Sequence, residues 1–138
     1  MKYLLLLAVF LSIPAYGETP KVLTNALEAY IEKGSSKLIP TLLKGSPLEG
    51  DKGLIGQENM IAQIEAYYGS PESWEVLANC ELTDRIKITY YVVYHKTGPT
   101  YGLLQSFKKS NNDEIATSFL FNTEAKQILP FFPIKKGA

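Results

Sequence analysis

The chain is poor in the residues that bind metals, and it carries no excess of charge of either sign. Cys80 is the only cysteine and His95 the only histidine. A single cysteine excludes an internal disulfide and a thiolate cluster, and one histidine without clustered carboxylates does not make a metal site. The 14 basic and 14 acidic residues cancel, so no net field draws in nucleic acid or an anionic membrane. We therefore predict no metal, no cofactor and no nucleic-acid partner, and we expect Cys80 to be a buried hydrophobic side chain.

A hydrophobic run long enough to span a membrane is also missing. The apolar run over residues 4–13 is shorter than the roughly 20 residues that a membrane span needs. Lys2 precedes this run, and Ala15, Tyr16 and Gly17 follow it as a small-x-small cleavage site. This is the pattern of a secretory signal peptide, so residues 1–17 predict export, to the periplasm or as a secreted protein, with cleavage near Gly17. The alternatives are an uncleaved anchor and an N-terminal core strand.

Residues 18–138 are long enough for a single domain with a hydrophobic core. In their first half, apolar residues recur at helical spacing. The spacing predicts one helix between Pro20 and Gly34, a second, short helix that ends at Gly45, and a third helix over residues 57–68. Turn-forming residues separate the second helix from the third. The first half is therefore predicted to be helical.

After Ser73 the period of the apolar residues changes from 3.6 to 2, as in strands. The alternation predicts strands over residues 74–83, 86–96, 100–108 and 114–122, with short turns between them. Connections this short leave no room for crossover helices, so neighbouring strands must be antiparallel. The predicted fold class is α+β, with three N-terminal helices packed on one face of a curved four-stranded antiparallel sheet.

Two stretches give this arrangement a family resemblance. They are "EAYYGSPESWEVLANCEL", which joins the last helix to a long strand, and "VVYHKTGPTYGLLQSFKKSNNDEIATSFLFNTE", which reads as consecutive hairpin strands. With the element order, they make residues 21–130 resemble the NTF2-like superfamily, whose cone-shaped fold is also called cystatin-like. The resemblance implies an apolar cavity between helices and sheet and a dimer through the sheet. Some members are isomerases, dehydratases or epoxide hydrolases, but their inward carboxylate base, Asp-Arg-Asp relay or His-Asp pair cannot be matched here.

Strand alternation divides the aromatic stretch "ITYYVVYHKTGPTYG" between two faces. Tyr90 and Tyr94 share one face of their strand, whereas Tyr91 and His95 share the other. The face without charge is expected under the helices, and a bulge in the strand would invert this assignment and bring His95 inside. The predicted inner side chains have the composition of a pocket for a hydrophobic ligand, and equally of a filled core. The predicted ligand-binding residues are Tyr30, Trp74, Tyr90, Tyr94, Tyr101, Phe119 and Phe121.

The opposite, outer face is also expected to be apolar. Its predicted interface residues are Leu77, Tyr91, Val93, Leu104 and Leu120. Contiguous apolar surface on a monomer usually marks an interaction site, so we predict a homodimer or a partner contact there. The alternative is that the C-terminal stretch "ILPFFPIKK" folds back across this face.

The sequence favours a binding module over an enzyme, and it assigns no catalytic residue. Acid-base catalysis needs a positioned group that reaches the substrate, and the acids of the strand region fall on the outer face, in turns or at strand ends. His95 is predicted to be a surface side chain. The first hypothesis is therefore an exported, non-enzymatic protein that binds a hydrophobic small molecule or a protein partner. The alternative is a small isomerase- or dehydratase-like enzyme in which Tyr90, Tyr94 or Tyr101 polarises a carbonyl and an acid from the helical half acts as base.

Overall fold

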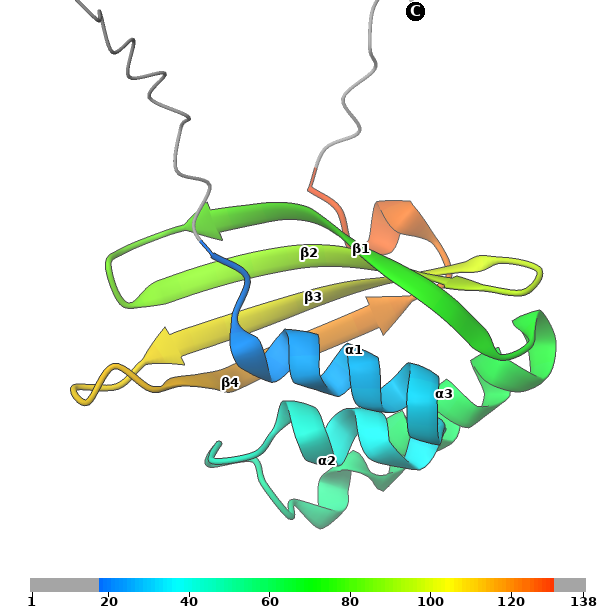
Figure 1. The fold of residues 1–138 in the computed structure, drawn as a ribbon, viewed down its shortest axis with the longest axis horizontal. Coiled ribbons are helices and arrows are strands. Elements are labelled where there is room, and N and C mark those ends of the chain that lie inside the picture. The colour runs from blue at the N-terminus through cyan, green and yellow to red at the C-terminus, as the bar shows by residue number, and fades with distance from the viewer. Residues whose placement is uncertain (1–17, 131–138) are drawn as a thin grey trace, which may run out of the picture.

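Helices occupy the first half of the chain and strands the second half (Figure 1). The computed structural model describes residues 18–130. The helices are α1 (Lys21–Lys33), α2 (Leu38–Leu42) and α3 (Ile55–Tyr68), and the strands are β1 (Pro71–Glu81), β2 (Ile86–His95), β3 (Pro99–Lys108) and β4 (Glu114–Asn122). Three short 3-10 turns are added at η1 (Ser35–Lys37), η2 (Lys52–Leu54) and η3 (Ala125–Gln127). The predicted α+β class, with three helices and a four-stranded antiparallel sheet, is confirmed.

The two chain ends fall outside this description. The predicted signal peptide, residues 1–17, lies outside the described residues, and so do residues 131–138. Within residues 18–130, the helices are too short or too polar to cross a membrane.

Glycines end the two longer helices where the sequence predicts an end. Gly34 follows α1 with φ +97°, and its N–H donates to the carbonyl oxygen of Tyr30 at 3.0 Å. Gly69 follows α3 with φ +86°, and its N–H donates to the carbonyl oxygen of Glu65 at 2.8 Å. Glycine adopts this left-handed backbone without steric cost, which makes it the usual residue after a helix.

The strands form an open antiparallel sheet in the order β1-β2-β3-β4. The register of β2 against β3 is continuous, but β1 carries irregularities between Pro71 and Ser73 and between Val76 and Ala78. A bulge moves the following residues to the other face of the sheet. Val76 accordingly pairs with Tyr91, whereas Ala78, two positions on, pairs with Tyr90, which points to the opposite face.

The hydrophobic core lies between the helices and the face of β2 that carries Tyr91 and Val93. Both side chains are buried in one cluster with Leu104 of β3. The helices contribute Leu23, Ala26, Leu27, Tyr30, Leu38, Ile39, Leu42 and Ile61 to the same cluster. The sequence-based assignment of the two faces of β2 is therefore wrong. Because β2 and β3 pair without a register shift, the inversion affects the whole length of both strands and is not caused by a bulge.

Several polar side chains of the inner face have hydrogen-bond partners, although the buried Ser106 hydroxyl has none among the described residues. Thr89 is fully buried, and its hydroxyl donates to the Asn79 side chain at 2.7 Å. Lys87, at the start of β2, donates to the carbonyl oxygen of Glu18 and lies 3.9 Å from the carboxylate of Glu114. Polar groups can be buried at low cost when they find such partners, so the absence of charge does not identify the inner face.

Candidate functional site

Uncharged side chains run across all four strands on the sheet face that is turned away from the helices. The row in the middle consists of cross-strand neighbours and contains Ala78, Tyr90, Leu103 and Leu120. The row on one side contains Cys80, Ile88, Gln105 and Ser118. The row on the other side contains Glu75, Val92, Tyr101 and Asn122. We call this side of the sheet the outer sheet face; it also carries Tyr94 of β2 and Leu77, the bulge residue of β1. Glu75 is the only charged residue in its three rows, and all of these residues belong to the described chain.

Several apolar side chains of this face are open to solvent. Leu120 is 55% exposed on the edge strand β4, and Leu77, in the bulge of β1, is 44% exposed. Tyr94 is similarly exposed, and its hydroxyl donates to the Glu75 carboxylate at 2.7 Å. That hydrogen bond raises the pKa of the Tyr94 phenol. The outer sheet face thus offers aromatic and aliphatic contact area with one carboxylate at its edge.

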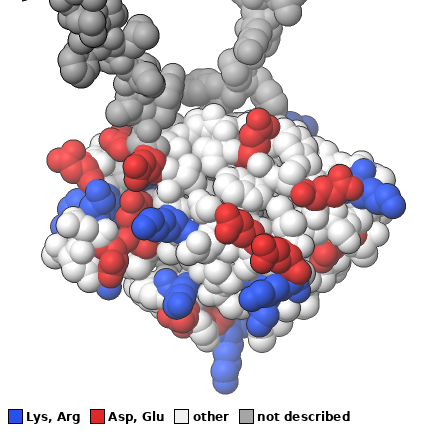
Figure 2. Space-filling model, in the orientation of Figure 1, with Lys and Arg blue, Asp and Glu red and all other residues white. Residues whose placement is uncertain are grey.

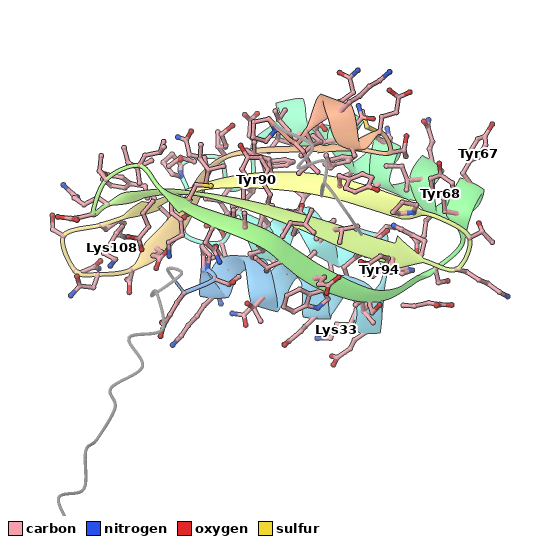
Figure 3. All side chains as sticks on the ribbon, turned by 90° about the horizontal axis from the view of Figure 1, so that it is seen from above. Lys33, Tyr67, Tyr68, Tyr90, Tyr94 and Lys108 are labelled. Carbon is pink, nitrogen blue, oxygen red and sulfur yellow. The ribbon has the colours of Figure 1, made fainter. Side chains whose placement is uncertain are left out.

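The C-terminal part of the described chain lies against the outer sheet face. After β4 the chain turns through η3, which lies on the opposite side of the sheet from α1 (Figure 3). Ile128 is buried, and Leu129 forms part of the wall of a groove of about 670 Å³. The remaining apolar lining of this groove includes Leu77, Val92, Tyr94, Pro99, Tyr101 and Ala125.

The predicted ligand-binding residues do not share one cavity. Tyr30 is buried in the core, and Trp74, Phe119 and Phe121 pack against it from the sheet. The other three, Tyr90, Tyr94 and Tyr101, lie on the outer sheet face, so their predicted inward orientation is wrong. The reason is the inversion of β2 and β3, because the residues that alternate with these tyrosines are the ones under the helices.

The space between helices and sheet holds a cavity of about 20 Å³, lined in part by Tyr30, Tyr91, His95, Thr100 and Phe121. One water needs roughly 10–15 Å³ of such space, whereas ligand pockets usually measure about 300–1,000 Å³. The cavity described here therefore has room for about one water and not for a hydrophobic ligand.

The predicted interface residues also divide between the two faces. Leu77 and Leu120 are exposed on the outer sheet face, as the sequence predicts. Tyr91, Val93 and Leu104 are buried in the core, so their predicted exposure is wrong. Cys80, which is predicted to be buried, is exposed on the outer sheet face instead. Of the predicted interface residues, the outer sheet face therefore carries only Leu77 and Leu120, and Lys87 and His95, which the sequence also places there, lie on the inner face.

His95 is buried, with 6% of its surface exposed, and both ring nitrogens have partners. Nδ1 lies 2.9 Å from the carbonyl oxygen of Gly69. A carbonyl can only accept, so Nδ1 carries a proton, and in the neutral ring Nε2 accepts from the Thr100 hydroxyl at 3.0 Å. The rings of Tyr30 and Tyr68 lie 6.0 and 6.4 Å from the imidazole. The sequence-based placement of His95 at the surface is wrong. Its ring connects β2 to Gly69, which follows α3, and to Thr100 of β3.

Buried hydroxyl groups near this histidine stay protonated. Burial, and secondarily the charge of Glu65, raises the pKa of Tyr30 far above its usual range. Burial also raises the pKa of Tyr91 far above that range. Among the described residues, His, Cys, Asp and Glu side chains form no group of three that could hold a metal ion.

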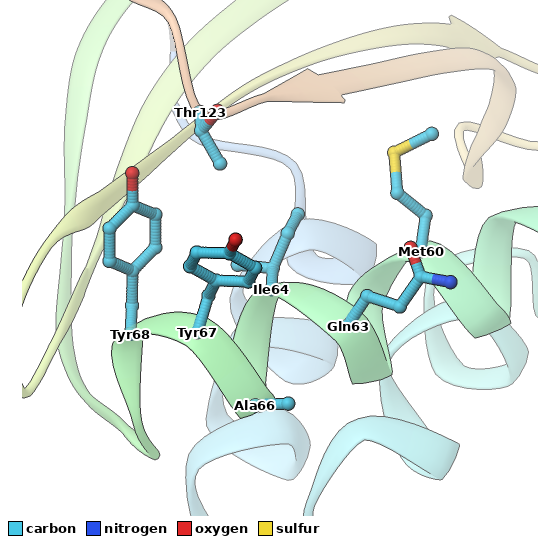
Figure 4. A pocket seen from close by; sticks show the side chains of 7 residues that line it. All are labelled: Met60, Gln63, Ile64, Ala66, Tyr67, Tyr68 and Thr123. Atoms are coloured by element: carbon cyan, nitrogen blue, oxygen red, sulfur yellow. The ribbon is translucent and has the colours of Figure 1, made fainter.

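A second groove, of about 490 Å³, runs along α3 (Figure 4). It is lined by Met60, Gln63, Ile64, Ala66, Tyr67, Tyr68 and Thr123. Tyr67 is 87% exposed, and its ring meets that of Tyr68 edge to face at 6.4 Å. The sequence groups Met60 and Tyr67 with the buried stripe of this helix, but only Ile61 and Ile64 are buried. The buried stripe of α3 is therefore narrower than the apolar spacing predicts. Nothing in the sequence distinguishes the buried Ile61 and Ile64 from the exposed Met60 and Tyr67.

Charge does not single out a site on the visible face of the molecule. Figure 2 shows basic and acidic side chains mixed over this face, without a region of one sign. No family model matches the chain, and no curated protein and no solved structure matches it.

Proposed function

We propose that this protein is an exported, non-enzymatic binding module that acts through its outer sheet face and forms a homodimer there. The observation that carries the proposal is the uncharged row of Ala78, Tyr90, Leu103 and Leu120 across the whole width of the sheet. Monomeric proteins rarely leave a contiguous apolar surface of this kind open to water. A binding partner is the simplest way to cover it.

A second copy of the chain suits this surface because an almost uncharged surface can pack against an identical one without repulsion between like charges. In a two-fold dimer the same patch meets itself, so like charges on the patch would repel. The outer sheet face has one charged residue in its three rows, Glu75, which lies on the edge strand β1 and accepts a hydrogen bond from Tyr94. Tyrosines such as Tyr90 and Tyr101 are enriched in protein interfaces because they combine apolar area with a polar tip.

The interior supports binding over catalysis. Acid-base catalysis needs a positioned group that reaches a bound substrate, and the internal cavity of about 20 Å³ has no room for one. His95 uses both ring nitrogens within the fold. The tyrosines that the sequence suggests for substrate contact lie on the outer sheet face, where they supply contact area.

Export and family membership belong to the same proposal. Export is supported by the basic, apolar and small-residue segments of residues 1–17. The NTF2-like assignment is supported by the order of the elements, with three helices followed by a four-stranded antiparallel sheet. Both are proposed on these patterns alone.

Sedimentation equilibrium of residues 18–138 tests the dimer. We expect the wild type to show a dimer mass and Leu120→Asp to dissociate it, because the new carboxylate would be desolvated in the interface. Leu120 is more than half exposed on an edge strand, so the variant should fold normally. The expected weakening is at least about tenfold in the dissociation constant, which corresponds to about 1.4 kcal/mol.

Tyr67→Asp is the matched control for this experiment. Tyr67 is also exposed and apolar, but it lies on α3, away from the outer sheet face. This variant should keep the dimer mass, and circular dichroism should show that both variants are folded. A monomeric wild type at all accessible concentrations, or equal dissociation by both variants, would contradict the proposal.

A further inference from the structure

The described chain ends beside the groove on the outer sheet face. Leu129 lines that groove, together with Leu77 of β1 and Tyr101 of β3. Ile128, one residue earlier, is buried. Pro130 is the last described residue. The described chain therefore ends at the wall of a largely apolar groove.

The sequence after Pro130 matches the groove in chemistry. Residues 131–134 are Phe, Phe, Pro and Ile, three large apolar side chains around one proline, and two lysines follow them. The groove offers Leu77, Val92 and Tyr101 as apolar contacts. Burying aromatic side chains against such a surface is favourable because it removes apolar area from water.

The length of this stretch also suits the groove. Four extended residues reach about 13 Å, at roughly 3.3 Å per residue. Neighbouring strands lie about 4.8 Å apart, so the stretch can cross from β3 over β2 to β1. Pro130 and Pro133 favour an extended chain, because proline restricts its own φ and disfavours helix in the residue before it.

We propose that residues 131–134 bind the outer-face groove of their own chain as an apolar strap that competes with the second copy for the outer sheet face. A segment tethered one residue from its site acts at an effective concentration in the millimolar range. It therefore occupies its own groove before another chain's segment does. The strap itself stands without a dimer, whereas its competition with a second copy rests on the proposed function.

Disulfide cross-linking tests the strap without reference to the dimer. In a Cys80→Ser background, which removes the natural thiol, Leu77→Cys is combined with Phe132→Cys. Cysteines form a disulfide only when their Cα atoms come within about 7 Å. Mild oxidation of residues 18–138 should give a cross-link within one chain, seen as a monomer that migrates faster in non-reducing electrophoresis.

The matched control for the cross-link is Leu82→Cys with Phe132→Cys in the same background. Leu82 is also exposed and follows β1, but it lies outside the groove. We expect this pair to cross-link at least about tenfold more slowly than the pair at residue 77. Equal rates for the two pairs, no cross-link at residue 77, or cross-links mainly between chains would each overturn the strap.

Sedimentation then tests the competition. Phe131→Ser combined with Phe132→Ser should tighten the dimer about tenfold, because the groove is then open to the second copy. Lys135→Ser combined with Lys136→Ser, just beyond the apolar stretch, should leave the dissociation constant within about twofold. A weaker or unchanged dimer in the phenylalanine variant would overturn the competition. A monomeric wild type would contradict the proposed function, and the cross-linking result would still decide on the strap.

Discussion

The ring of Tyr91 in β2 lies across Gly102 in β3, its direct cross-strand neighbour. A Cβ atom added at Gly102 would fall 2.0 Å from the Cζ atom of that ring. The glycine therefore makes room for an aromatic side chain on the inner face, where Tyr91 belongs to the core. This pair helps to explain why the face with Tyr91 can pack under the helices.

Gly102→Ala should destabilise the fold by about 1–3 kcal/mol, because the added methyl group overpacks the core and displaces the Tyr91 ring. Gly56→Ala, in the first turn of α3, is the control, since a Cβ there meets open space. The control should be neutral or stabilising by up to about 1 kcal/mol. Urea unfolding of both variants measures the difference. Equal stability of the two would show that Tyr91 does not lie over Gly102.

Nδ1 of His95 should carry a proton, because it lies 2.9 Å from the Gly69 carbonyl oxygen, which can only accept. Long-range ¹H–¹⁵N spectra distinguish the two nitrogens directly. Thr100→Val removes the donor to Nε2 and should cost about 1–3 kcal/mol, since a buried acceptor is left without a partner. Thr100→Ser keeps the hydroxyl and should cost less. An Nε2–H tautomer in the wild type would refute this geometry.

Alkaline pH should destabilise the fold through Tyr91. Burial raises its pKa above the usual value of 10.0, so the unfolded chain releases this proton at a lower pH than the folded chain does. The contribution to stability is complete below pH 10, and it is lost as pH rises from there toward the folded-state pKa. The slope is at most about 1.4 kcal/mol per pH unit for one group.

Tyr91→Phe should make this alkaline slope shallower, because it removes the buried phenol. The free energy of unfolding, measured by urea between about pH 9 and 11, reports the slope. Identical slopes in the wild type and in Tyr91→Phe would contradict the burial of the phenol.

Cys80 should report association of the outer sheet face. The thiol is exposed and lies in the row with Ile88 and Gln105. If a second copy covers this face, the labelling rate of Cys80 by a maleimide should fall as protein concentration rises through the dissociation constant. Leu120→Asp should abolish that concentration dependence. A labelling rate that is independent of concentration in the wild type would place the contact elsewhere or show that there is none.

Local chemistry explains how much of the secondary structure is predictable. The glycines at positions 34 and 69 end helices because they adopt a positive φ, and this signal is visible in the sequence. The fourth strand is predicted over residues 114–122 and spans Glu114–Asn122. The first strand begins at Pro71, three residues before the predicted start, because its pairing with β2 extends past the bulge near Pro71. Such pairing depends on a partner strand and not on local preference.

Alternation along β2 can be derived from the sequence, and it places Tyr90 and Tyr94 on one face and Tyr91 and His95 on the other. Which of these two faces the helices cover depends on the packing of the whole fold. The buried face contains His95 and Lys87, whose partners Gly69, Thr100, Glu18 and Glu114 come from other parts of the chain. Alternation is a local property of the backbone, whereas the cost of burying a polar group depends on partners that only the fold brings near.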